Sequence, residues 1–284
     1  MKITLSAFAD EAAADLHGQI EALRRNNITK IELRNLGGVN IKDLSESDAE
    51  KAAAAFAAAG ISVWSIGSPI GKSDIGADFA QVQRDLKHIL RLCKIFHCDK
   101  IRVFSFYTTS YGEVEGEVLR RLRLLVKEAG EQGVTLYHEN EKDIFGDVAS
   151  RVETILDGVE GLKSIFDPAN YLQVGESAEN MARMRARADY FHIKDVIRAT
   201  GELVPAGEGD GDIPAMIAEL GRDAVFTLEP HLSVFSGYAA IDRQEMKNKY
   251  QFSSNGEAFD AAAAALKKLF IAQGYREVEG GFEK

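Results

Sequence analysis

The chain has 284 residues, 45% of them hydrophobic, which is enough to build one α/β barrel of about 250 residues. Its 34 lysine and arginine residues against 44 aspartate and glutamate residues give a net charge of −10, and its pI is near 5.2. This acidic balance argues against a nucleic acid as partner, because nucleic-acid binding depends mostly on basic groups that meet phosphates.

Neither a membrane segment nor a disulfide framework is indicated. The first residues run directly into an apolar strand, and no apolar run approaches the roughly 18 residues that cross a bilayer. We therefore expect a cytoplasmic protein without a signal peptide. The two cysteines, Cys93 and Cys98, are expected to be buried small side chains.

Strand-like and helix-like segments alternate along the whole chain. Strands are expected at residues 3–8, 30–33, 61–66, 100–104, 134–139, 162–166, 190–193 and 224–228. Helices are expected at about residues 10–26, 47–60, 77–96, 114–132, 148–156, 178–186, 214–220 and 257–273. This alternation implies parallel strands joined by helical crossovers.

Eight such units predict an α/β fold, a (β/α)8 TIM barrel in a single domain. The barrel is expected to span residues 1–276, followed by a mobile, charged C-terminal tail at 277–284. An open doubly wound sheet is the alternative. That fold would favour a glycine fingerprint after the first strand, and Ala7-Phe8-Ala9-Asp10 contains none.

Four consecutive strands end in residues that can bind a metal. Glu139 ends the fifth strand, Asp167 the sixth, His192 the seventh and Glu229 the eighth. The active site of a barrel lies at the carboxyl ends of its strands, so these side chains are expected to meet there.

Three crowded carboxylates repel one another unless a cation neutralises them. One divalent ion with a nitrogen and three oxygen ligands would do so, and Mn²⁺, Mg²⁺, Co²⁺ and Zn²⁺ all fit such a set. A single carboxylate at a strand end is more often a helix-cap partner or a surface charge. Four of them at successive strand ends favour the metal site.

The chain resembles the xylose isomerase-like barrel superfamily, in particular its sugar phosphate isomerase/epimerase branch, which includes ketose 3-epimerases. The resemblance covers nearly the whole chain and is carried by four short motifs in order. They are His-Glu-Asn-Glu around Glu139, Phe-Asp-Pro-Ala-Asn around Asp167, His-Ile-Lys-Asp from His192 and Leu-Glu-Pro-His around Glu229. In that branch the four residues that match Glu139, Asp167, His192 and Glu229 together bind one divalent metal.

The resemblance also implies a mechanism. Glu139 and Glu229 are expected to ligate the metal and to flank the substrate carbon from opposite faces. One glutamate removes a proton α to a carbonyl and the other returns a proton, while the metal stabilises the enediolate. The partner would be a small-molecule sugar, sugar phosphate or related polyol ketone.

Two positions near the quartet are compared with the epimerase pattern. The epimerases often have a histidine three residues after the sixth-strand aspartate, where this chain has Asn170. They also tend to have an arginine six residues after the seventh-strand histidine, which Arg198 matches. We expect Asn170 and Arg198 to bind substrate, but the change to Asn170 puts the reaction in doubt.

Further substrate-binding candidates follow other strands. Lys194 and His231 lie two residues after His192 and Glu229, at the same rim. Glu32, two residues before Arg34, is expected either to pair with that arginine or to contact substrate. Lys72 follows Pro69 and Gly71 in a loop suited to an anion, with a salt bridge to Glu32 as the alternative.

Two other features are given supporting roles. His138 alternates with Glu139 along the strand and is expected to support the site from outside the barrel. The glycine-rich segment at 205–212 is not expected to hold phosphate, because its own carboxylates would repel it. It also lacks the Gly-Lys-Ser/Thr of a P-loop.

The leading hypothesis is therefore a divalent-metal-dependent isomerase or epimerase. A dehydratase that starts with the same proton abstraction, as in inosose dehydratase-like relatives, is the alternative. An endonuclease IV-like enzyme is disfavoured, since that chemistry needs a histidine-rich three-metal site and a basic surface. A non-catalytic sugar-binding protein also stays open. So does a homo-oligomer in which the connection at 230–255 packs on another subunit instead of closing the pocket.

Overall fold

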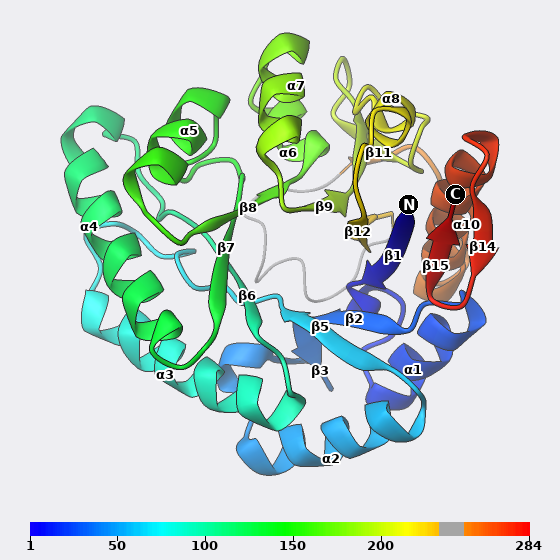
Figure 1. The fold of residues 1–284 in the computed structure, drawn as a ribbon, viewed down its shortest axis with the longest axis horizontal. Helices are drawn as coiled ribbons and strands as arrows, with labels where there is room; N and C mark the ends of the chain where they lie inside the picture. The colour runs from blue at the N-terminus through cyan, green and yellow to red at the C-terminus, as the bar shows by residue number, and fades with distance from the viewer. Residues whose placement is uncertain (233–246) are drawn as a thin grey trace.

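The structure, a computed structural model, describes residues 1–232 and 247–284. Eight parallel strands form a closed barrel, and each pairs with the next barrel strand along the chain (Figure 1). β12 pairs with β1 from Ile3 opposite Ala224 to Ala7 opposite Leu228, which closes the barrel. The barrel strands are β1 (Lys2–Ala7), β2 (Lys30–Leu33), β5 (Ser62–Ile66), β6 (Lys100–Val103), β7 (Thr135–Glu139), β8 (Lys163–Phe166), β9 (Tyr190–Ile193) and β12 (Ala224–Leu228).

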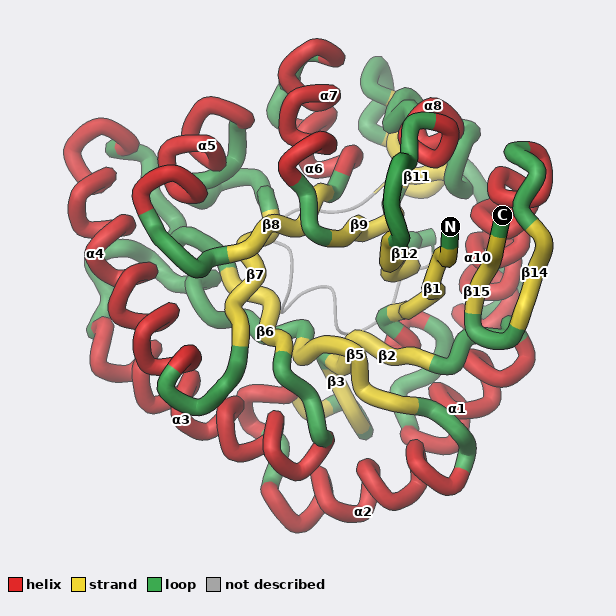
Figure 2. The backbone as a smooth tube through the Cα atoms, in the orientation of Figure 1, coloured by secondary structure: helices red, strands yellow, loops and turns green. Residues whose placement is uncertain are grey.

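Helices surround this barrel on its outside (Figure 2). The predicted (β/α)8 fold in a single domain is therefore confirmed. The helices are α1 (Leu16–Arg25), α2 (Glu46–Ala58), α3 (Phe79–Phe96), α4 (Tyr111–Gly130), α5 (Ala149–Gly158), α6 (Pro168–Gln173), α7 (Ala178–Arg187), α8 (Ile213–Ala218) and α10 (Asn255–Ala272). Among the helices that the structure describes, none is long and apolar enough to cross a membrane.

The first helix starts later than the sequence predicts. Asp10 and Glu11 lie in a short 3-10 turn, η1 (Ala9–Glu11), and α1 begins only at Leu16. Asp15 provides the cap, because its carboxylate accepts a hydrogen bond from the backbone of Gly18. Asp10 and Glu11 are instead buried against Arg34 at the end of the barrel where the strands terminate.

The interior of the barrel is filled by aromatic side chains from alternate strands. Tyr190 of β9 contacts the rings of Trp64 of β5 and Tyr137 of β7, with ring centroids 6.0 and 5.3 Å away. Strands two apart place side chains in the same layer of a barrel. The ring of His192 lies 5.5 Å from that of Tyr190, so this aromatic layer supports the polar end.

The C-terminal residues are not a mobile tail, and that prediction is wrong. They form a hairpin of β14 (Arg276–Val278) and β15 (Gly281–Glu283), and β15 pairs antiparallel with the first half of β1. Phe282 is fully buried and stacks on Phe270 of α10, with centroids 5.0 Å apart. The charged side chains of this segment are exposed, while Gly281 and Phe282 are buried, so its charge alone does not predict mobility.

Besides the hairpin of β14 and β15, five smaller strands in the described residues lie outside the eight-stranded barrel, and three of them follow β9. β3 (Asn35–Leu36) and β4 (Val39–Asn40) form a hairpin that is followed by the turn η2 (Ile41–Asp43). β10 (Asp195–Ile197), β11 (Glu202–Val204) and β13 (Lys247–Asn248) form a three-stranded sheet after β9. The predicted connection at 230–255, with its expected role in closing the pocket or in a homo-oligomer, lies largely outside the described residues.

The glycine-rich segment after β11 binds an anion from its own chain. The backbone N–H groups of Gly207, Gly209 and Gly211 donate hydrogen bonds of 2.8 to 3.1 Å to the carboxylate of Asp195. A Cβ atom at Gly209 would lie 2.3 Å from that carboxylate, so glycine is required there. The loop is therefore a carboxylate cradle that fixes β10, and these backbone N–H groups are used by Asp195.

Candidate metal centre

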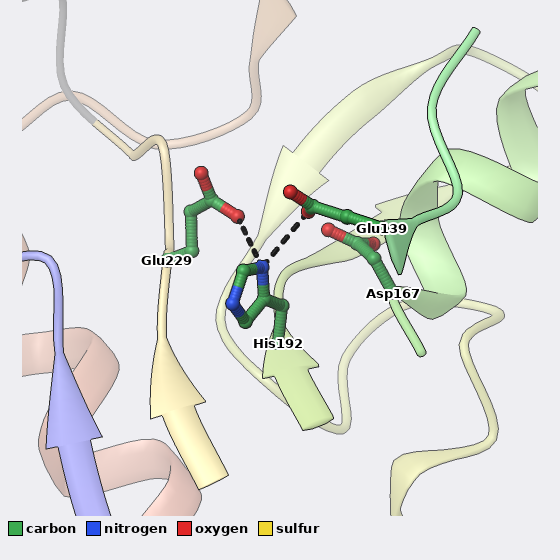
Figure 3. A group of neighbouring side chains, drawn as sticks. All are labelled: Glu139, Asp167, His192 and Glu229. Atoms are coloured by element: carbon green, nitrogen blue, oxygen red, sulfur yellow. Dashed lines mark hydrogen bonds and ion pairs between the residues drawn. The ribbon is translucent and has the colours of Figure 1, made fainter. Parts of the chain in front are cut away.

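The four residues predicted from the strand ends meet at the carboxyl end of the barrel. Figure 3 shows Glu139, Asp167 and Glu229 around the ring of His192. One ligand atom from each lies within 4.8 Å of all the others, and all four side chains are buried. The expected convergence of these side chains is therefore confirmed.

Asp167 is positioned by the start of a helix. It caps α6, and its Oδ1 accepts a hydrogen bond of 3.0 Å from the backbone of Asn170, while Pro168 sits at the first helical turn. The side chain of Asn140 exchanges two bonds of 2.9 Å with the backbone of Asp167. Consequently the end of β7 and the end of β8 are tied together, and Oδ2 of Asp167 is left facing the cluster.

Asn170 serves this scaffold. Its side chain is buried and donates a hydrogen bond of 2.9 Å to the carbonyl of Asn140. Its predicted contact with substrate stays a prediction. Asn140 itself links the two strands just beyond their last paired residues, Glu139 and Ile165.

The ring of His192 lies between carboxylates on both sides. Its Nδ1 is 2.8 Å from Oε1 of Glu139 and 3.3 Å from Oε2 of Glu229, while its Nε2 is 3.1 Å from Glu32. Glu32 also accepts hydrogen bonds of 3.1 Å from Tyr190 and Thr227. A histidine that binds a metal through one ring nitrogen commonly donates from the other to a carboxylate, and Glu32 has that position.

Glu32 is therefore not placed as the sequence led us to expect. It is fully buried beneath His192, and its carboxylate does not pair with Arg34. Arg34 instead forms ion pairs with Asp10 at 2.9 Å and Glu11 at 3.3 Å. The buried carboxylate is satisfied from three directions, which suits an orienting role.

The crowding of the cluster shifts its pKa values. Burial raises the pKa of Asp167 to about 7, although the nearby Lys194 lowers it. Burial alone would lower the pKa of His192, but the Glu139 and Glu32 carboxylates raise it well above its ordinary value. Burial disfavours the charged form of Glu229, yet Lys194 and His192 hold its pKa well below the usual range.

The donor set fits a divalent cation. Among the described residues, the only close contacts of the buried Oδ2 of Asp167 and Oε2 of Glu229 are ion pairs, with Lys194 at 3.2 Å and with His192 at 3.3 Å. Buried polar atoms are normally satisfied, so these two oxygens have capacity for another ligand. With Oε1 of Glu139 and Nδ1 of His192 they would complete a set of three oxygens and one nitrogen.

Two arginines beside the cluster were not predicted as site residues. Nη1 of Arg34 lies 2.9 Å from Glu229, and Nη1 of Arg102 lies 3.2 Å from Glu139. Both guanidinium groups pack on the ring of Phe8, at 4.5 and 4.9 Å from its centroid. The sequence could have indicated Arg102, because it is a charged residue within an apolar strand. A charge in such a position needs a buried partner.

Lys194, Lys72 and His231 are brought to the same end of the barrel. Nζ of Lys194 lies 3.2 Å from Oδ2 of Asp167, so this lysine is part of the cluster. Lys72 pairs with Glu141 at 2.9 Å, and the alternative pairing with Glu32 is wrong.

The imidazole of His231 lies 3.3 Å from Glu11 and 3.4 Å from Glu229. Burial lowers the pKa of His231 to about 4. Its neutral ring therefore lies beside Oε1 of Glu229, whereas Oε2 of Glu229 faces His192.

Two predicted residues lie away from the four-residue cluster. Arg198, in the hairpin after β10, donates a hydrogen bond of 2.6 Å to the carbonyl of Glu176 and lines a separate cavity of about 410 Å³. His138 is buried behind Glu139, where its Nε2 lies 3.0 Å from the hydroxyl of Ser105. His138 therefore supports the strand end, as its alternation with Glu139 predicts.

Comparison with known proteins identifies the fold family. The family model described as xylose isomerase-like TIM barrel matches residues 20–269, while no curated protein matches the chain. The solved structures similar in fold include the IOLI protein with a bound zinc atom, at 15% identity and a TM-score of 0.74, covering 96% of this chain and 99% of that one.

Two further structures have different described activities. L-ribulose 3-epimerase has 17% identity and a TM-score of 0.69, with 96% of this chain and 95% of that one covered. The probable 3-DHS dehydratase AsbF from Bacillus anthracis has 15% identity and a TM-score of 0.68, with 94% and 99% covered. At such identities these likenesses show the fold alone, whereas the family model spans most of the chain. The protein belongs to the xylose isomerase-like TIM barrel family.

Proposed function

We propose that this protein is a divalent-metal-dependent isomerase or epimerase that acts on a sugar, a sugar phosphate or a related polyol ketone. The observation that carries the proposal is the position of Glu139 and Glu229, which approach Nδ1 of His192 from two different strands (Figure 3). A pair of carboxylates on opposite sides of one point can remove a proton from one face of a carbon and return it to the other.

The residues of the chain have distinct roles in this proposal. Glu139, Asp167, His192 and Glu229 would hold the cation, which is Mn²⁺, Mg²⁺, Co²⁺ or Zn²⁺. When bound, the cation would polarise the substrate carbonyl and stabilise the negative charge that develops on its oxygen. Glu139 takes the α-proton, and Glu229 delivers a proton from the opposite face.

The arginines fix the positions of these glutamates. Arg102 contacts Glu139 at 3.2 Å and Arg34 contacts Glu229 at 2.9 Å. Both contacts are buried, so water competes little with them and the glutamates are held in fixed orientations. Each glutamate keeps its second oxygen for the cation or the substrate.

A dehydratase is the second candidate, and Lys194 is the observation that favours it. Its ammonium lies 3.2 Å from Oδ2 of Asp167 and can donate a proton to a leaving hydroxyl group nearby. The same initial proton abstraction would then end in loss of water. A solved structure of similar fold is described as a probable 3-DHS dehydratase, which also supports this alternative. Mass spectrometry of the product separates the two, because an epimerase conserves the mass of its substrate.

The proposal is tested by following solvent deuterium into the α-carbon of ketoses, ketose phosphates and inososes. We expect exchange that requires about one divalent ion per chain and that is lost after chelation. Glu139→Gln and Glu229→Gln should each lower the rate at least 100-fold, since general acid–base groups contribute about 10²–10⁴-fold. The exposed Glu160→Gln is the matched control and should leave the rate unchanged. Full exchange after exhaustive chelation would contradict the proposal.

A further inference from the structure

A second feature of the carboxyl end is the cavity that Arg198 lines. It measures about 410 Å³ and lies among segments that follow β7, β8 and β9. Those strands contribute Glu139, Asp167 and His192, so the cavity opens at the same end of the barrel as the metal centre. Lys142 of its lining lies only three residues after Glu139, which limits their Cα separation to about 11 Å.

The lining of this cavity is positively charged in an acidic protein. Lys142, Arg198 and Lys247 contribute three cations, and among the described lining residues Asp143 is the sole acid. The whole chain has a net charge of −10. A local excess of cations on such a surface favours an anionic ligand, because clefts lined by one sign of charge concentrate ions of the opposite sign.

Arg198 is anchored but still has donors to offer. Its Nη2 is used by the carbonyl of Glu176, and its backbone N–H donates 2.7 Å to Asp210. Within residues 1–232 and 247–284, neither Nε nor Nη1 of Arg198 makes a hydrogen bond. A guanidinium that is fixed at one nitrogen presents its other donors in a defined plane, which suits an oxygen anion.

Lys247 is held at the opposite wall by strand pairing. β13 pairs parallel with β11, so that Lys247 lies opposite Glu202. Glu202 accepts a hydrogen bond of 2.9 Å from Thr200, and the described residues contain no ion pair within 4.0 Å of Lys247. Two cations on separately fixed segments therefore face one cavity whose walls include the buried apolar side chains of Val196 and Leu203.

We propose that this cavity binds the anionic group, a phosphate or a carboxylate, at the far end of the substrate whose carbonyl lies at the metal centre. The inference rests on the proposed function for the identity of the substrate, but not for the binding of an anion. It narrows the substrate class to phosphorylated or acidic sugars and polyol ketones. The reacting carbon and the charged group would be held by different segments after neighbouring strands.

The first experiment measures the binding of inorganic phosphate to the metal-free protein by calorimetry at fixed ionic strength. Arg198→Gln and Lys247→Gln should each weaken binding by roughly tenfold, as expected for the loss of one charge-assisted hydrogen bond. Lys249→Gln is the matched control, since it removes the same charge two residues away on an exposed side chain outside the cavity lining. Phosphate binding that is absent, or that Lys249→Gln weakens equally, would overturn the inference.

The second experiment assigns the anion to the substrate. Phosphate should compete with a ketose phosphate in the deuterium-exchange assay, and Arg198→Gln should raise KM for that substrate about tenfold with little change in kcat. The unphosphorylated ketose should show no change in KM. Phosphate that binds without competing would refute the assignment to substrate. If no compound exchanges deuterium at all, the proposed function fails, and the phosphate titration still reports on the cavity.

Discussion

Glu32 differs from the other carboxylates of the site, because it lies on the far side of the His192 ring. Its oxygens accept hydrogen bonds from Tyr190, Thr227 and Nε2 of His192, and its side chain is fully buried. This arrangement orients the ring and directs Nδ1 toward Glu139 and Glu229. We therefore assign Glu32 to orienting the histidine and not to contacting the substrate.

Glu32→Gln is expected to weaken metal binding by about 10- to 100-fold, because a neutral amide raises the basicity of His192 less than a carboxylate does. The bonds from Tyr190 and Thr227 can persist, so the fold should be retained. Titration with Mn²⁺, followed by calorimetry, measures the affinity, and saturating metal should restore most of the exchange rate. An unchanged affinity would show that Glu32 does not act through His192.

At the scale of elements, the hairpin of β14 and β15 extends the barrel sheet beyond its eight strands. Lys2 pairs with Glu283 and Thr4 with Gly281, while the second half of β1 pairs with β2. The hairpin thus covers the edge of β1 that β2 leaves unpaired. An unpaired strand edge exposes backbone groups, so this element completes the structure of the barrel.

Phe282→Ala is expected to lower the free energy of unfolding by about 3–5 kcal/mol, because it leaves a cavity beside Phe270 in a fully buried position. Urea denaturation followed by circular dichroism measures the change. Ile271→Ala is the control. The side chain of Ile271 is 56% exposed on the outer face of α10 and should change stability by less than about 0.5 kcal/mol. Equal effects of the two substitutions would mean that the hairpin contributes nothing to stability.

At the scale of the whole molecule, closure of the barrel creates contacts between the ends of the sequence. Arg34, near the N-terminus, reaches Glu229 of the last barrel strand, and Glu11 accepts a hydrogen bond of 2.7 Å from the backbone of His231. The site therefore depends on the complete ring of strands. If acid pH unfolds the protein, all contacts of the site should therefore be lost together.

Acid should destabilise the fold through His138. Burial lowers the pKa of His138 to about 3 from an ordinary value of 6.5, so below pH 6.5 the unfolded chain takes up a proton that the folded chain does not. Stability is therefore fully present above pH 6.5 and falls by up to about 1.4 kcal/mol per pH unit toward pH 3.

His138→Gln should reduce this pH dependence, measured as the urea midpoint at pH 4, 5, 6 and 7. His17→Gln is the matched control, because His17 is 83% exposed and lies on α1. A slope that His138→Gln leaves unchanged would show that other buried groups dominate acid unfolding.

The sequence by itself determined the barrel and the four-residue cluster. The alternation of strands and helices requires parallel strands, and parallel strands place all their carboxyl ends on one side. Each of the four residues lies within one position of the end of a strand, so their convergence follows from local pattern: Glu139, Asp167, His192 and Glu229. The same reasoning places His138 behind Glu139, since side chains alternate along a strand.

The tertiary structure alone decided the partners of each charge. Glu32, Arg34 and Arg102 are paired with residues far away in sequence, and no local pattern specifies which carboxylate a buried arginine meets. The charged sequence at 277–284 predicts a tail, whereas the hairpin forms there because its burial depends on the open edge of β1. The periodicity of the sequence predicts which face of each helix or strand is buried. Contacts across the barrel depend on how the barrel closes, and the closure is defined only in the folded chain.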